Sequence, residues 1–111
     1  MIVGDEQQAR TEALFRDVNE RIAESAEGFD DDEADFVCEC GEQACTERVP
    51  ATLDEYERVR ADGRRFLIRP GHENERIERV VERRSRFSVV EKFQGRVVAI
   101  VRKLDPRLGP I

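Results

Sequence analysis

The chain has 111 residues, of which 39% are hydrophobic and 40% charged, a balance typical of one small, charge-rich domain. No apolar run approaches the roughly 20 residues of a membrane span. The first residues lack the basic region and the long apolar stretch of a secretory signal. We therefore expect a cytoplasmic protein without membrane contact, in which thiols stay reduced.

The net charge of −6 conceals two unlike halves. Residues 1–50 carry 4 basic and 15 acidic side chains, whereas residues 51–111 carry 15 basic and 10 acidic ones. The halves could attract each other within the fold or present different faces to partners. A basic patch at Arg64, Arg65 and Arg69 could contact nucleic acid, but an isoelectric point near 4.9 argues against strong affinity. We expect the partner to be a protein.

The first predicted element is an amphipathic helix over residues 5–27. Its apolar side chains at Leu14, Phe15, Val18 and Ile22 have helical spacing, so the pattern predicts that this stripe faces the core. Pairing of the stripe with a second copy of the chain is the alternative, which makes a homodimer through residues 5–27 possible.

Two acid-first pairs on the same helix, Glu12–Arg16 and Asp17–Arg21, have the four-residue spacing of helical ion pairs. Such pairs each contribute a few tenths of a kcal/mol. We expect both to form along the helix.

The rest of the chain predicts short strands and short helices. An acidic run at 30–33 reads as a solvated loop, and Thr52 with Glu55 forms a capping box at the start of a short helix. Residues 95–104 fit either a helix or a strand. Strands are predicted over 35–40, 66–68, 76–82 and 86–92. Together these elements predict an α+β domain, with the helix of residues 1–28 packed on a small antiparallel sheet within a core of residues 29–111.

All three cysteines and the one histidine form the candidate site: Cys38, Cys40, Cys45 and His72. Thiolate with imidazole is a common tetrahedral zinc set, and an odd number of cysteines suits a metal better than disulfides. In a strand, residues two apart point to one side, so Cys38 and Cys40 would converge. The gaps of one and four residues depart from the usual two to four.

The fourth ligand decides what such a site does. With His72 the shell is closed and the zinc is structural. Glu39, Glu42 or water could complete the shell instead, and an open position would permit hydrolysis with Glu39 or Glu42 as general base. Zinc-bound thiolates could also act as a redox switch, because oxidation releases the metal. A non-enzymatic, zinc-stabilised binding or regulatory module is the function we expect.

The chain resembles a family of small uncharacterised actinobacterial proteins. The resemblance rests on the Cys-x-Cys-x4-Cys cluster at 38–45, on Pro70-Gly71-His72, and on Phe15-Arg16-x-Val18 in the first helix. It implies a shared metal site and a cytoplasmic bacterial setting, and it carries no established activity.

Overall fold

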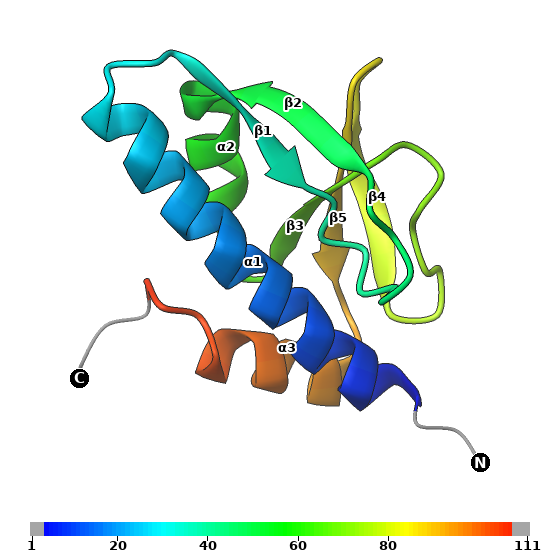
Figure 1. Ribbon diagram of the computed structural model, residues 1–111. Coiled ribbons are helices and arrows are strands. Elements are labelled where there is room, and N and C mark those ends of the chain that lie inside the picture. The colour runs from blue at the N-terminus through cyan, green and yellow to red at the C-terminus, as the bar shows by residue number, and fades with distance from the viewer. Residues whose placement is uncertain (1–3, 108–111) are drawn as a thin grey trace.

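Residues 4–107 are described by a computed structural model, in which three helices surround two small antiparallel sheets (Figure 1). The α+β class is therefore confirmed, although the strands form two sheets and not one. In chain order the elements are α1 (Gly4–Gly28), β1 (Glu33–Val37), β2 (Arg48–Thr52), α2 (Leu53–Arg60), β3 (Arg65–Ile68), β4 (Glu78–Arg83), β5 (Ser88–Lys92) and α3 (Gly95–Lys103).

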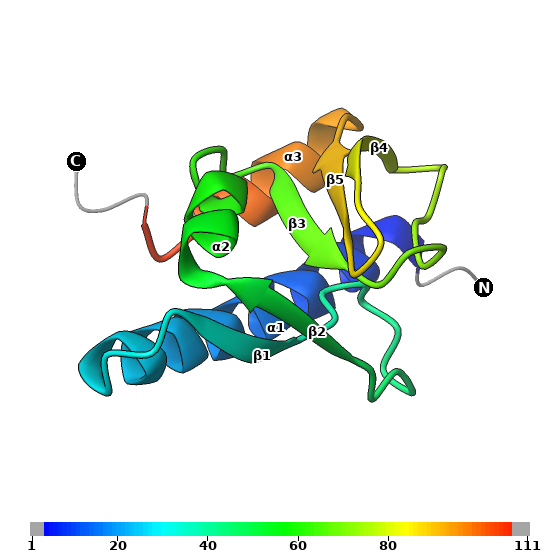
Figure 2. The same cartoon turned by 90° about the horizontal axis from the view of Figure 1, so that it is seen from above.

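The first sheet pairs β1 with β2, and the second has the order β3-β5-β4, with β5 in the centre. Helix α1 packs on β1 and also on α3, so it runs along the whole molecule (Figures 1 and 2). The two sheets meet where the backbone N–H of Glu39, just after β1, donates to the carbonyl of Leu67 in β3 at 2.9 Å.

Side chains close to the first turn cap both short helices. The Thr52 hydroxyl accepts from the Glu55 N–H at 3.0 Å, and the Glu55 carboxylate accepts from the Thr52 N–H at 2.8 Å, so the capping box is confirmed. The segment that fitted either a helix or a strand is α3, and its N-cap is the side chain of Gln94. Its buried residues, Val97 and Val101, are four apart, which is helical spacing.

The buried face of α1 differs from the predicted one. Leu14 is 60% exposed and Val18 40% exposed, while Phe15 and Ile22 are half-buried. The side that faces the protein includes three polar residues that are fully buried. The buried residues of the helix are Ala9, Thr11, Glu12, Ala13, Arg16, Asn19 and Ala26.

Arg16 lies in the interior, where backbone carbonyls and an aromatic ring offset part of the cost of burying its charge, although its Nε has no hydrogen-bond partner within residues 4–107. Its guanidinium donates to the carbonyls of Gly63 and Val101, each at 2.7 Å. The group also lies over the Phe66 ring, 4.5 Å from the centroid, where a cation is attracted by the ring face. The expected Glu12–Arg16 pair on the helix surface is therefore wrong.

Glu12 is buried for a similar reason. It forms an ion pair with Lys92, which also binds Glu78, and all three side chains are fully buried. Burial raises the pKa of Glu12 to about 7, against the lowering effect of Lys92. The predicted Asp17–Arg21 pair does not form either, since Asp17 Oδ1 has no hydrogen-bond partner.

Ion pairs join the acidic and basic halves of the chain, which is one of the two arrangements expected from the charge distribution. Most involve carboxylates of α1, and in Glu20–Arg60 the guanidinium is fully buried. Opposite halves therefore attract within the fold. The pairs that cross between the halves include Asp5–Arg76, Glu6–Arg96, Glu12–Lys92, Glu20–Arg60, Glu20–Arg107 and Glu47–Arg69.

Candidate metal centre

The four predicted ligands lie together. One side-chain donor atom from each of Cys38, Cys40, Cys45 and His72 falls within 4.8 Å of all the others, and the three cysteines are free thiols. The Nδ1 atom of His72 lies 3.5 Å from the Cys38 sulfur and 3.7 Å from the Cys45 sulfur. The cluster could therefore hold a metal ion that joins the segment after β1 to the turn after β3.

These separations suit a small tetrahedral cation. With Zn–S near 2.3 Å and Zn–N near 2.0–2.1 Å, tetrahedral angles place sulfur and nitrogen about 3.5 Å apart. The separations between His72 Nδ1 and the sulfurs of Cys38 and Cys45 are close to that value.

The convergence of Cys38 and Cys40 has a different origin from the predicted one. Strand β1 ends at Val37, so both cysteines lie beyond the strand that was expected to extend to residue 40. The residue between them, Glu39, is held by β3, since its carboxylate accepts from the Leu67 N–H at 2.8 Å. Glu39 thus faces the interior from one side of the segment, and its two neighbours present their thiols to the site.

A tight turn fixes the backbone of His72. Its N–H donates to the carbonyl of Arg69 at 3.1 Å, and Gly71 has a φ of +89°. Proline followed by a residue with positive φ defines a type II turn, in which glycine is strongly favoured at the third position. Pro70-Gly71 therefore fixes the backbone at His72 by local chemistry alone.

Backbone N–H groups face all three sulfurs. The N–H of Arg69 donates to Cys38 Sγ at 3.2 Å, and the backbone groups of Glu42 and Glu47 bond to Cys40 and Cys45. Such donors stabilise thiolates, the form that binds metal.

The thiol pKa values reflect shared protons within the cluster. The pKa of Cys40 is lowered to about 5, mainly because the Cys38 thiol donates to it. The same contact raises the pKa of Cys38, and burial raises that of Cys45. One thiolate is therefore favoured without metal, and a metal ion would displace the remaining protons.

Sequence reasoning missed two residues that join the site to α1, one on the helix and one in the cysteine loop. The amide of Gln8 donates to the Cys40 carbonyl at 3.2 Å and to Glu12 at 2.9 Å, and it accepts from Asn74 at 2.8 Å. Gly41 has a φ of +78°, and a Cβ there would lie 2.6 Å from Glu12 Cγ. The cysteine loop thus lies directly against the helix, a contact that no local pattern indicates.

The surroundings of Glu39 and Glu42, the two alternative ligands or general bases, differ. Glu39 is fully buried, and its carboxylate is bound by Asn19 at 2.7 Å and by the Leu67 N–H. Burial raises its pKa to about 7, but its carboxylate is held by these partners and is not among the four clustered donors, which does not support Glu39 as a ligand or base at the cluster. Glu42 is exposed and is not among the four clustered donors.

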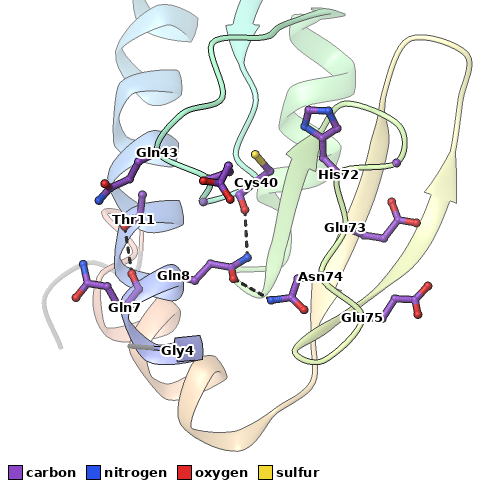
Figure 3. Close-up of a pocket in the computed structure, with 13 residues that line it drawn as sticks. Gly4, Gln7, Gln8, Thr11, Cys40, Gln43, His72, Glu73, Asn74 and Glu75 are labelled. Atoms are coloured by element: carbon purple, nitrogen blue, oxygen red, sulfur yellow. Dashed lines mark hydrogen bonds between the residues drawn. The ribbon is translucent and has the colours of Figure 1, made fainter. Parts of the chain in front are cut away.

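An open groove of about 1050 Å³ borders the cluster. Figure 3 shows its residues, which come from the first turns of α1, the cysteine loop and the segment after His72. Many are amides or carboxylates, and none of the described lining residues is lysine or arginine. The lining consists of Gly4, Gln7, Gln8, Thr11, Cys40, Gly41, Glu42, Gln43, Gly71, His72, Glu73, Asn74 and Glu75.

The predicted basic patch is paired with acidic side chains. Arg64 binds Asp62 at 2.8 Å, Arg65 binds Glu91 at 3.1 Å, and Arg69 lies 3.5 Å from Glu47. A phosphate would have to compete with these carboxylates, so the arrangement does not favour nucleic acid.

None of the helices in residues 4–107 has the length and apolar character needed to cross a bilayer.

Comparisons with known proteins add no relative. No family model matches the chain, and neither a curated protein nor a solved structure shows significant similarity to it.

Proposed function

We propose that the protein is a non-enzymatic binding module whose fold is stabilised by one structural zinc ion. The observation that supports it is the meeting of Cys38, Cys40, Cys45 and His72 within 4.8 Å. Three sulfurs with one imidazole nitrogen favour zinc over magnesium or calcium, which prefer oxygen ligands.

Four protein ligands make the proposed zinc structural. A catalytic zinc keeps one position for water or substrate, whereas the four clustered side chains could supply a full tetrahedral set. Glu39, the buried carboxylate between Cys38 and Cys40 in the sequence, is bound to Asn19 and to the Leu67 backbone, which leaves it without a role as a general base. A hydrolase is therefore the weaker alternative.

The groove beside the cluster is the proposed binding surface. Its lining includes the carboxylates of Glu42, Glu73 and Glu75 and no lysine or arginine among the described residues. Three thiolates with one Zn²⁺ would add a further negative charge. The surface is therefore complementary to a basic segment of a partner protein.

Metal content is the first test of this proposal. Protein purified without added metal should contain one zinc per chain by elemental analysis, and Cys38→Ser should lower the zinc content and the melting temperature. Ser85→Ala, in a turn remote from the cysteines, is the matched control. If the native protein carries no zinc and Cys38→Ser melts like the control, the proposal fails.

A redox-sensitive regulator is the second candidate, and one observation favours it. His72 is exposed and Cys45 only partly buried, whereas Cys38 and Cys40 are buried, so one side of the cluster is open to solvent. Two thiolates would be oxidised to a disulfide by one hydrogen peroxide, which takes up two protons and is reduced to two waters. The loss of two thiolate ligands would release the zinc. Zinc release under peroxide, with rebinding after a thiol reductant, is the expected result, and zinc retention would exclude this candidate.

A further inference from the structure

The outer face of α1 carries two apolar side chains that the rest of residues 4–107 leaves largely exposed and two that it covers in part. Leu14 and Val18 are 60% and 40% exposed. Phe15 and Ile22 beside them are half-buried, and Ile22 packs partly against the core. In Figures 1 and 2, α1 runs along one side of the molecule. We call these four residues the outer stripe.

Charged residues of alternating sign follow one side of the outer stripe. They are Arg10, Asp17, Arg21 and Glu24 in chain order. None has an ion-pair partner within residues 4–107: Arg10 donates only to a backbone carbonyl, and Asp17 Oδ1 has no hydrogen-bond partner. Most charged residues of α1 on the inner side, by contrast, are paired within the fold.

We propose that the outer stripe binds the same stripe of a second copy, with the two helices antiparallel about a two-fold axis at Val18. In this arrangement residue 10 of one helix is level with residue 26 of the other. Arg10 then lies within two residues of Glu24 of the second copy, an offset of about 3 Å. Asp17 lies equally close to the levels of Arg21 and of Asp17 of the second copy, so the two Arg21 side chains bracket the two Asp17 carboxylates along the interface.

The apolar residues fit the same axis. Leu14 shares a layer with Ile22 of the second copy, because the two positions lie four residues on either side of Val18. Val18 meets its own counterpart at the axis. One register thus brings together the apolar layers and the opposite-charge pairs.

Self-complementarity is what selects a second copy as the occupant. A two-fold interface uses one patch twice, so the patch must carry both signs in mirrored order. The order plus, minus, plus, minus along α1 meets this requirement. The exposed ion pairs set register and orientation, while removal of the outer stripe from water provides the stabilisation.

Sedimentation velocity of the zinc-loaded full chain, from about 1 to 200 µM in low salt, tests the proposal. The wild type should shift from monomer to dimer over this range. Val18→Glu should be monomeric throughout, since it places two carboxylates at the axis. Phe93→Glu, at an apolar residue that is 49% exposed outside α1, should dimerise like the wild type.

A charge exchange tests the register. Arg21→Asp opposes Asp17 of the second copy and should weaken association at least tenfold, and the double variant Asp17→Arg with Arg21→Asp should restore it. Circular dichroism confirms that each variant retains its helices. A wild type that stays monomeric, a Val18→Glu variant that still dimerises, or a double variant that does not recover each overturns the proposed pairing.

Discussion

Replacement of His72 by alanine isolates the contribution of the metal as a link between distant segments. The substitution leaves the three thiols in place but removes the donor that belongs to the turn after β3. His72 is 34 residues from Cys38 and 27 residues from Cys45. A cross-link that closes a loop of about 30 residues stabilises by roughly 3–4 kcal/mol, because it limits the unfolded chain.

We therefore expect His72→Ala to lower the free energy of unfolding by about 3 kcal/mol in saturating zinc. For a domain of this size that corresponds to a fall in melting temperature of roughly 10–15 °C. Thermal unfolding followed by circular dichroism measures the difference. In EDTA neither protein holds the metal, so the two melting temperatures should agree to within a few degrees.

Glu75→Ala is the matched control, since Glu75 is an exposed residue three positions away in the same loop. It should melt like the wild type with and without zinc. If the melting temperatures of His72→Ala and wild type differ by the same amount in zinc and in EDTA, the imidazole stabilises the fold without metal, and the reasoning from cross-linking is refuted. The same conclusion follows if zinc does not raise the melting temperature of the wild type.

Three further substitutions test the buried side of α1 and its contact with the cysteine loop. Burial raises the pKa of Glu12 from 4.5 to about 7, so its stabilising effect is complete below pH 4.5 and is lost as the pH rises through 7. Between pH 4.5 and 8, the free energy of unfolding of Glu12→Gln, measured by urea titration, should fall by up to about 3 kcal/mol less than that of the wild type. Arg16→Met leaves the carbonyls of Gly63 and Val101 without donors and should cost about 3–5 kcal/mol in the same assay. Gly41→Ala forces a Cβ against Glu12 in a backbone of positive φ, so it should cost about 2 kcal/mol or more and weaken zinc binding in a competition assay with a chromophoric chelator.

Two conservative variants serve as controls for these substitutions. Arg102→Met removes an arginine that is exposed on α3, and Gly28→Ala adds a Cβ that meets nothing within 4 Å. Both should change stability by less than about 0.5 kcal/mol. Arg16→Met or Gly41→Ala variants as stable as these controls would contradict the assigned roles, as would a Glu12→Gln variant with the pH dependence of the wild type.

Features encoded by neighbouring residues were predictable from the sequence. The capping box of Thr52 and Glu55 needs only a four-residue pattern, and the turn before His72 needs only Pro70-Gly71. The metal cluster was predictable for a related reason, since few residue types bind zinc and the chain has only four cysteine and histidine side chains. Their spacing did not have to be ideal, because β3 positions the segment from Cys38 to Cys40.

The orientation of α1 was not predictable in the same way. Apolar periodicity placed Leu14 and Val18 in the core, because burial of apolar area is the usual driving force. The structure instead buries Glu12 and Arg16, whose partners lie 80 residues away at Lys92 and 85 residues away at Val101. A charged residue reads as a surface residue until its distant partner is known.

The side chain of Asn19 has a consequence for how the first sheet ends. Its amide accepts from the Val37 N–H at 2.8 Å and donates to the Val37 carbonyl at 2.9 Å. A helix side chain thereby reproduces the pair of bonds that a neighbouring strand would make. The edge of β1 that faces α1 is thus closed at Val37, where it leads into the cysteines. The Val37 N–H and carbonyl are already bonded, so an extended chain cannot pair with them, and aggregation through this part of the edge is blocked.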